Sequence, residues 1–380
     1  MSKIKVGMGA TIWGRGLENH QLDGIGYYTQ EIFRQLENKN IHLNPIIFGK
    51  SGPDLFINRP AIRLDRYGVS TALSALTGFP FKGSSLLSKS IDIFHATDHC
   101  TPKLKGVPVV ATLMDAIPMS HPQWGSQNLR AIKNWLWRTS AHWADHIITI
   151  SEFSRQEVAK HFRIPESRIT VTPLGVDERY FDRLSGNAAD HVLSQYVLPE
   201  QFFIFIGTLQ PRKNIERIVH AHEMLPAALR AQCPLLIVGR KGWGCDELAN
   251  KLNTGQPNGP VRWLQNINDF EKRVLLQHAT AMVFPSLLEG FGLPVLEGFA
   301  SQTPVITSNT SSLPEVAGDA AWTLDPTNVH SIAEAMQALA TNQALARHFV
   351  QKGLVRANMF TWDTCAEKTL KVYEQVLGKA

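Results

Sequence analysis

Two glutamates bracket the segment best suited to binding a charged, hydroxyl-rich ligand. Glu289 and Glu297 begin and end the sequence EGFGLPVLE. Pro294 suits the first position of a helix, so the loop of residues 290–293 would offer free backbone amides to an anion. The two carboxylates could accept hydrogen bonds from the hydroxyls of a sugar and of a ribose. The alternative is structural: Glu297 would complement the helix dipole, and Glu289 would be a surface charge.

A second segment carries two adjacent cations. Arg212 and Lys213 lie in GTLQPRKN, between the apolar run FFIFIG and a helical pattern that begins at Ile215. Two cations at a helix N-terminus oppose the helix dipole, unless a polyanion such as a diphosphate binds there. A solvated Arg-Lys pair in a loop is the alternative.

Two further turns could take part in ligand binding. Gly24 and Gly26 precede an amphipathic helix, where glycines let backbone amides approach a phosphate, although a tight turn with positive φ would also explain them. Asp115 ends the apolar run VPVVATLMD. It could bind a hydroxyl or act as a base, or it could cap the segment that follows.

The segment 130–143 combines basic and aromatic residues in a helical pattern. Its tryptophans are Trp135, Trp137 and Trp143, and its cations are Arg130, Lys133 and Arg138. Such a helix can lie on a membrane surface, whereas packing in a core is the commoner use of tryptophan.

These segments require elements that bring them to one edge of a sheet. Short apolar runs alternate with helical patterns along the whole chain, which predicts right-handed βαβ units and parallel sheets covered on both faces. The predicted strands are 5–8, 44–48, 91–95, 108–113, 146–150, 202–206, 234–238, 261–264, 281–284 and 303–307. Ligands of such α/β sheets bind at the carboxyl ends of the strands, where the turns described above lie.

The chain is long enough for two domains, since it has 380 residues and a domain has roughly 150. A polar stretch between residues 179 and 201 predicts the boundary. We therefore expect one Rossmann-like domain over residues 1–190, and a second over residues 191–360 that faces it across a cleft. Residues 360–378 form a terminal helical pattern.

Composition narrows the class of protein. Hydrophobic residues are 44% and charged residues 19% of the chain, as in ordinary globular proteins. The net charge of +5 comes without a dense basic run, so it fits anionic small molecules or an anionic membrane surface, and we expect no nucleic-acid partner. The four cysteines and fourteen histidines show no metal-ligand spacing. We predict no metal, no cofactor and a cytoplasmic location.

Taken together, these motifs resemble retaining glycosyltransferases of family 4, which have the GT-B fold. Glu289 and Glu297 resemble that family's paired-glutamate motif, and GTLQPRKN resembles its G-x-x-x-x-R-K-N turn. The resemblance covers nearly the whole chain, most closely residues 201–325. It implies an acceptor-binding N-terminal domain, a nucleotide-sugar-binding C-terminal domain, and a terminal helix (361–380) that crosses back to the N-terminal domain.

The resemblance also implies roles for individual residues. Arg212 and Lys213 would hold the donor diphosphate, Glu289 the donor sugar and Glu297 the ribose. Three amides (Phe291, Gly292, Leu293) would contact the diphosphate or the sugar, Asn266 and Ile267 would border the base, and Gly24 and Gly26 would form a loop facing donor and acceptor. Asp115 matches the aspartate of a frequent His-Asp turn, in which the histidine is replaced by Met114. The candidates to replace that histidine are His95, His99 and His121.

The function implied is transfer of mannose or a deoxyhexose such as rhamnose from a GDP-linked nucleotide sugar. The expected acceptor is a glycan or a polyprenyl-diphosphate-linked oligosaccharide in O-antigen synthesis, with peripheral contact at the inner face of the plasma membrane. In such enzymes a donor phosphate oxygen takes the acceptor's proton, so no protein nucleophile is required. The alternatives are a UDP-sugar-dependent transferase, a GT-B sugar-nucleotide epimerase, and a non-catalytic nucleotide- or glycan-binding protein.

Overall fold

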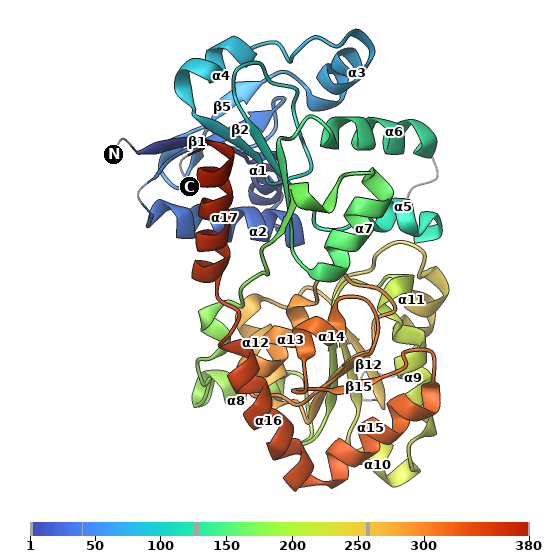
Figure 1. The fold of residues 1–380 in the computed structure, drawn as a ribbon. Coiled ribbons are helices and arrows are strands. Elements are labelled where there is room, and N and C mark those ends of the chain that lie inside the picture. The colour runs from blue at the N-terminus through green and yellow to red at the C-terminus, as the bar shows by residue number, and fades with distance from the viewer. Residues whose placement is uncertain (1–2, 40, 125–128, 256–258, 379–380) are drawn as a thin grey trace. The chain divides into compact units, whose positions relative to one another are not determined.

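The computed structural model describes residues 3–39, 41–124, 129–255 and 259–378. The chain forms two compact units (Figure 1), the first comprising Met1–Gly175 with Trp362–Ala380 and the second Val176–Thr361. The division therefore falls at Gly175, ahead of the predicted residue 190. The reason is that the segment after Gly175 packs within the second unit: α8 (Asn187–Gln195) lies against α12 (Asp269–His278), and Gln277 accepts a hydrogen bond from the Leu184 amide at 2.9 Å.

The first unit is built on a parallel sheet. Among its described residues, seven strands pair in the order β5-β2-β1-β6-β7-β8-β9. Their bounds are β1 Ile4–Gly9, β2 Ile41–Phe48, β5 Ile62–Leu64, β6 Ile93–Ala96, β7 Val109–Thr112, β8 His146–Thr149 and β9 Ile169–Val171, with a small hairpin of β3 Leu55–Phe56 and β4 Arg59–Pro60. The central strands β1, β6, β7 and β8 are almost wholly buried, as expected for a sheet covered on both faces, whereas the edge strands β5 and β9 are only partly buried.

Helices cover both faces of this sheet (Figure 1). They are α1 Thr11–Glu18, α2 Gly24–Glu37, α3 Tyr67–Thr77, α4 Ser84–Ser90, α5 Ile117–Ser120, α6 Arg130–Ala141, α7 Glu152–Phe162 and α17 Trp362–Val376, with short 3-10 turns η1 Pro122–Trp124 and η2 Glu166–Arg168. Residues 130–141 are a helix as predicted. Trp137 and Trp143 pack against the core and only Trp135 of the three is exposed, so the core alternative holds for those two tryptophans.

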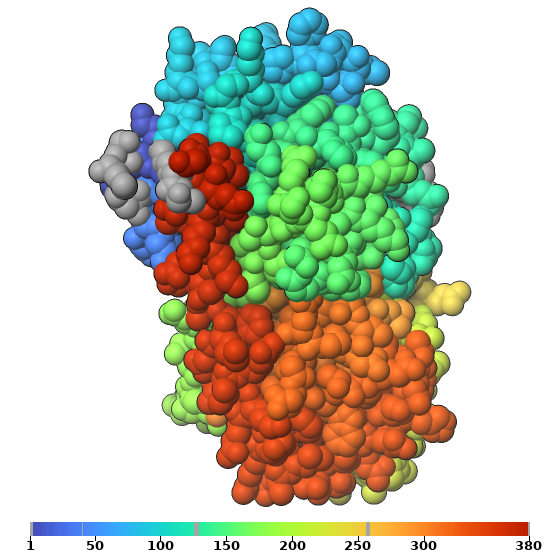
Figure 2. Space-filling view, viewed as in Figure 1, coloured from blue at the N-terminus to red at the C-terminus, as the bar shows by residue number. Residues whose placement is uncertain are grey.

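The last helix belongs to the first unit. α17 packs against α2 and β8. In Figure 2 its red atoms lie directly beside the blue and green segments of that unit. Trp362 meets Tyr27 edge-on, with ring centroids 5.8 Å apart, and Tyr373 lies 2.7 Å from the His95 ring nitrogen Nδ1. The predicted return of the terminal helix to the N-terminal domain is confirmed.

The second unit repeats the plan. Over its described residues, six parallel strands pair in the order β12-β11-β10-β13-β14-β15, which is the 3-2-1-4-5-6 order of a Rossmann domain. The strands are β10 Phe203–Ile206, β11 Leu235–Val238, β12 Val261–Leu264, β13 Ala281–Phe284, β14 Val305–Ser308 and β15 Trp322–Leu324. The fold class predicted from the alternating pattern, two Rossmann-like domains, is confirmed.

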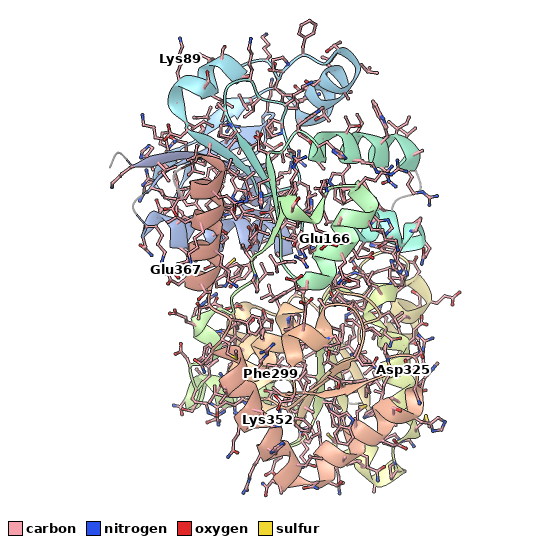
Figure 3. All side chains as sticks on the ribbon, in the orientation of Figure 1. Lys89, Glu166, Phe299, Asp325, Lys352 and Glu367 are labelled. Carbon is pink, nitrogen blue, oxygen red and sulfur yellow. The ribbon has the colours of Figure 1, made fainter. Side chains whose placement is uncertain are left out.

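The helices of this unit include those that follow each strand. They are α8, α9 Ile215–Met224, α10 Ala227–Gln232, α11 Asp246–Asn253, α12, α13 Leu293–Ala300, α14 Leu313–Ala317, α15 Val329–Thr341 and α16 Gln343–Ala357, with 3-10 turns η3 Glu178–Tyr180 and η4 Pro211–Lys213. Phe299, labelled in Figure 3, is buried in α13, and a Cβ added at Gly353 of α16 would come within 2.7 Å of its ring. Glycine at 353 therefore lets α16 pack closely on α13.

Candidate functional site

The strand order of the second unit creates a place where two loops meet. The chain leaves β10 toward β11 on one side and later returns to β13 on the other side. Because β10 and β13 are neighbours in the sheet, the loops that follow them start side by side at its carboxyl edge. This edge is where α/β domains bind ligands. The Leu287 amide donates a hydrogen bond to the Arg212 carbonyl at 2.8 Å, which joins the two loops directly.

Glu289 is bonded to both cations at this junction. Its Oε1 accepts a hydrogen bond from Lys213 Nζ at 2.5 Å, and its Oε2 accepts one from Arg212 Nη1 at 2.7 Å. The three side chains are only 8%, 10% and 20% exposed for Glu289, Lys213 and Arg212. Neither the surface-charge alternative for Glu289 nor the solvated Arg-Lys pair is therefore correct. The cluster keeps one positive charge in excess.

Burial and charge pairing set the ionisation of this cluster. Burial would raise the pKa of Glu289, but Lys213 and Arg212 outweigh that effect and lower the pKa to about 2. Burial lowers the pKa of Lys213, and the carboxylate of Glu289 opposes that shift. Lys213 also lies over the Phe284 ring, with Nζ 4.7 Å from the centroid. Glu289 is thus a carboxylate at neutral pH and acts as an acceptor of hydrogen bonds.

Residues that the sequence analysis did not select hold this cluster in place. Asn214 has a left-handed backbone (φ 63°) and donates from Nδ2 to the carbonyls of Pro285 at 2.9 Å and Pro326 at 2.7 Å. The Ser312 hydroxyl lies 2.9 Å from the Glu289 carbonyl, and the Glu289 amide donates to Ser311 Oγ at 3.2 Å. The run SNTSS at 308–312 was the available clue, because short hydroxyl side chains after a strand often bond to loop backbone.

α13 begins at Leu293, one residue earlier than predicted, with Pro294 as its second residue. Gly292 is the N-cap residue with φ 107°, and a Cβ there would come within 2.6 Å of Leu313 Cδ2, so this position requires glycine. Phe291 is buried against Phe360, and Leu293 begins the helix. Glu297 is the fifth helical residue, beyond the first turn, and lies 3.7 Å from Lys272 Nζ. The dipole alternative for Glu297 is therefore weak.

Asn266 and Ile267 follow β12 at the same edge of the sheet. Asn266 is exposed with a left-handed backbone (φ 58°), and Ile267 is half-buried. Since β11 and β10 separate β12 from β13, these residues lie at some distance along the edge from Glu289. The structure brings Arg212, Lys213 and Glu289 together, and places Asn266 and Ile267 farther along.

In the first unit, Gly24 and Gly26 lie inside the first turn of α2 rather than before it. Neither has a positive φ, so the tight-turn alternative is wrong. Asp23 caps the helix, accepting a hydrogen bond from the Gly26 amide at 2.8 Å. A Cβ at Gly24 would have no neighbour within 4 Å, so this glycine leaves open space at the helix N-terminus.

Asp115 acts as a local cap in this structure. Its Oδ1 accepts a hydrogen bond from the Ile117 amide at 3.0 Å, at the start of α5. That contact is the capping alternative, and it leaves the second carboxylate oxygen, Oδ2, for another role. Asp115 also contributes to the electrostatics of His99, whose pKa burial lowers while Asp115 and Asp98 oppose the shift.

Of the three histidines considered as replacements for Met114, His99 has the most suitable place. His95 is fully buried between Tyr373 and Thr112, and burial lowers its pKa to about 3, so it is a core residue. His121 is stacked on Trp124. His99 follows β6, and its Nδ1 is buried without a hydrogen-bond partner among the described residues.

A cavity of about 410 Å³ opens beside His99. Its lining comes from α3, α5, α6 and the loop after β6, and includes Tyr67, Pro118, Lys133 and Trp137. Trp137 Nε1 is a second buried donor without a partner in the described part of the chain. The cavity therefore offers a largely apolar wall and two cations, Arg130 and Lys133, to a ligand. A cluster of three or more His, Cys, Asp or Glu that could hold a metal ion does not occur within residues that the structure describes.

Comparison with known proteins identifies the two units. Residues 22–180 match the family "Glycosyltransferase Family 4", and residues 194–356 match the family "Glycosyl transferases group 1". An O-antigen chain mannosyltransferase B of Escherichia coli is 35% identical over 60% of this chain and 60% of its own length. The serotype-specific mannosyltransferase WbdA of Escherichia coli is 30% identical over 62% of this chain, but over only 29% of its own length.

A solved structure shows the same fold across the full chain. Sucrose-phosphate synthase from Thermosynechococcus elongatus superposes with a TM-score of 0.76 at 18% identity, covering 100% of both chains. The family 4 match lies in the first unit except for its last five residues, 176–180, and the group 1 match lies wholly in the second unit. The chain therefore belongs to the GT-B glycosyltransferases that join a family 4 domain to a group 1 domain.

Proposed function

We propose that this chain transfers mannose, or a deoxyhexose such as rhamnose, from a GDP-linked nucleotide sugar with retention of configuration. The acceptor would be a lipid-linked oligosaccharide or polysaccharide of O-antigen synthesis. The observation that carries the proposal is the buried cluster of Glu289, Arg212 and Lys213 at the junction of the β10 and β13 loops. Its excess positive charge lies beside the N-terminus of α13, and both features favour a diphosphate.

In this proposal the cations stabilise the leaving group. Arg212 and Lys213 would contact the diphosphate, together with the amides of Phe291, Gly292 and Leu293, as negative charge develops when the glycosidic bond breaks. Glu289 is ionised and bonded to both cations, so it would orient them and accept hydroxyls of the donor sugar rather than attack it. A donor phosphate oxygen would take the proton of the acceptor hydroxyl.

The other predicted donor contacts follow from the same arrangement. Glu297 would accept the ribose hydroxyls, and Asn266 and Ile267 would border the base. No metal or cofactor enters this scheme, because the two cations and the helix amides supply the electrostatic stabilisation.

The first unit would hold the acceptor. Gly24 leaves space at the start of α2, Gly26 lies in the same turn, and the cavity beside His99 has two cations, Arg130 and Lys133, that a phosphate or sugar hydroxyl could contact. Asp115, with one carboxylate oxygen beyond its bond to Ile117, would bind an acceptor hydroxyl. We place the reaction in the cytoplasm, at the inner face of the plasma membrane when the acceptor is lipid-linked.

The sugar assignment draws on the named relatives, which are mannosyltransferases matched over 60% and 29% of their lengths. No described helix is long and apolar enough to cross a membrane.

The test is thermal stability against a panel of GDP, UDP, ADP and dTDP with their common sugars. A ligand that binds only the folded state stabilises it by RT ln(1 + [L]/Kd), so about 2.7 kcal/mol is gained at a hundred times Kd. We expect GDP and GDP-mannose to raise the unfolding temperature of the full chain, and the other nucleotides to leave it unchanged.

A shift with UDP alone would overturn the donor assignment but keep the transferase. No shift with any nucleotide would contradict the donor site itself. Release of GDP and epimerisation of the sugar without acceptor would support the epimerase instead.

A further inference from the structure

α3 of the first unit has its apolar side chains on the outside. Val69, Leu73 and Leu76 follow helical spacing along one face and are 60%, 57% and 77% exposed, whereas the buried residues of the helix are Thr71 and Ser74. A helix that packs on a core normally shows the opposite distribution. The exposed face of α3 therefore carries apolar residues that intramolecular packing does not explain.

The apolar surface continues beyond the helix. Phe79 is 73% exposed, and an open groove of about 500 Å³ runs between it and α3. Its lining includes the apolar Val69, Leu73 and Phe79 and the charged Asp65, Arg66 and Lys82. We call Val69, Leu73, Leu76 and Phe79 the α3 face.

The adjoining helix extends this surface. α6 packs against α3 in the first unit (Figure 1) and exposes Ile132 and Trp135, and Leu129 just before the helix is exposed as well. Trp137 of the same helix turns inward to the core. Two neighbouring helices thus expose apolar stripes.

The charge around the α3 face is positive. The groove is lined by two cations, Arg66 and Lys82, and one acid, Asp65, and residues 65–145 as a whole contain eight Lys and Arg against five Asp. Arg66, Lys82 and Lys89 are exposed and form no ion pair with a described residue, and Lys89 extends from α4 away from the sheet in Figure 3.

The acids of this segment lie in different environments. Asp92 accepts a hydrogen bond from the Lys5 amide, Asp98 is buried, and Asp115 caps α5. Asp65 is the acid that lines the groove. The surface therefore combines apolar side chains with unbalanced cations.

We propose that the α3 face docks on an anionic lipid bilayer, with its apolar side chains entering the boundary between headgroups and acyl chains. Exposed cations next to apolar side chains match that boundary, where lipid phosphates lie above hydrocarbon. A second copy of the chain is a poorer fit, since it would bring the same excess of positive charge. The choice of a bilayer as the binding partner rests on the lipid-linked acceptor of the proposed function. The description of the α3 face rests only on its exposed side chains and does not depend on that function.

The test is co-sedimentation of the full chain with vesicles of phosphatidylcholine, alone or with about one third phosphatidylglycerol. We expect binding to the anionic vesicles that weakens as salt is added. The triple variant Leu73→Ser, Leu76→Ser, Phe79→Ser should bind these vesicles at least about tenfold more weakly than the unchanged chain. The control variant Leu55→Ser, Val355→Ser removes exposed apolar side chains elsewhere and should bind as the unchanged chain does.

Further outcomes separate this proposal from others. Equal binding of the triple variant and the unchanged chain would overturn it, as would absence of binding to anionic vesicles. A dimer seen by analytical ultracentrifugation without lipid, and lost in the triple variant, would assign the face to self-association instead. The nucleotide panel serves as the independent measure of the donor site: the triple variant should keep its stability shift. Loss of vesicle binding with an unchanged shift therefore concerns the surface alone.

Discussion

At the scale of single residues, the environment of Glu289 decides its chemistry. Its type and place in the sequence allow either a sugar contact or a surface charge. The neighbouring cations Lys213 and Arg212 outweigh the effect of burial, lower its pKa to about 2 and so keep it a carboxylate. That information could not come from the sequence, because the three residues meet only when the loops after two different strands come together. The same applies to Asn214, whose two bonds reach Pro285 and Pro326.

Replacing the only carboxylate of this three-residue cluster tests whether the diphosphate binds to the two cations. Glu289→Gln leaves two cations close together without their anion, so the ligand-free variant should lose about 3 kcal/mol of stability. GDP would then replace the missing charge, and we expect it to raise the unfolding temperature of the variant more than that of the unchanged chain. Glu223→Gln, which breaks an exposed ion pair with Lys251, is the control. An equal GDP shift in Glu289→Gln would show that the diphosphate does not meet these cations.

Lys213→Ala tests the stabilisation of the leaving group. Loss of one cation should reduce transfer at least about a hundredfold, because a preorganised charge near the leaving group acts mainly in the transition state. Lys251→Ala removes an exposed, ion-paired lysine of the same unit and should leave transfer unchanged. The measurement is sugar transfer from GDP-mannose to a lipid-linked acceptor. Normal turnover in Lys213→Ala would remove this residue from the mechanism.

At the scale of elements, the sequence predicted the strands that define the fold. Residues 261–264 and 281–284 form strands with the predicted bounds, and 269–278 is a helix as predicted. The short strands β9 and β15 were missed, since three residues give no measurable period. α3 was missed for a physical reason: its apolar residues face outward, so its pattern did not indicate a packed helix.

Asn214 tests how strongly the loops of the site depend on one side chain. Asn214→Ala removes donors from two buried carbonyls and places a Cβ residue without a turn-forming side chain at φ 63°, which together should cost about 3 kcal/mol. Asn214→Gly keeps the backbone conformation and should cost less. Asn328→Ala, which removes an exposed helix cap, should cost about 1 kcal/mol. Chemical denaturation compares them, and equal losses for Asn214→Ala and Asn328→Ala would contradict the role given to Asn214.

At the scale of the whole molecule, the chain was expected to form two Rossmann-like domains, and it does. The division at Gly175 could not be read from the sequence. Polar composition marked the stretch after residue 179, but the packing of α8 on α12 and the bond from the Leu184 amide to Gln277 place that stretch in the second unit. Composition indicates where a chain is exposed, and packing decides which unit it joins.

Buried histidines should make the whole molecule sensitive to mild acid. Burial lowers the pKa of His95, His99, His146 and His222. Near pH 6.5 the histidines of the unfolded chain become protonated, whereas the buried histidines of the folded chain stay neutral. The free energy of unfolding that each neutral histidine contributes is therefore fully present above that pH and is lost as the pH falls toward the folded pKa. Each contributes at most about 1.4 kcal/mol per pH unit.

Unfolding temperatures at pH 7, 6 and 5 would measure this effect. Glu289 does not contribute in that range, because its stabilisation is lost only below the unfolded glutamate pKa of about 4.3 and toward about 2. Asp98, whose pKa burial raises, acts in the opposite direction but is a single group. A constant unfolding temperature from pH 7 to pH 5 would show that the histidines are protonated in the folded chain.

The position of α17 has a consequence for how the chain is made. The first unit begins the sequence, yet its core contacts include Tyr373 against His95 and Trp362 against Tyr27. A ribosome releases Val176–Thr361, the whole of the second unit, before it releases those partners. During synthesis the first unit therefore lacks the helix that covers part of its core until the end of translation, while the second unit can already fold. The order of completion is the reverse of the order of translation.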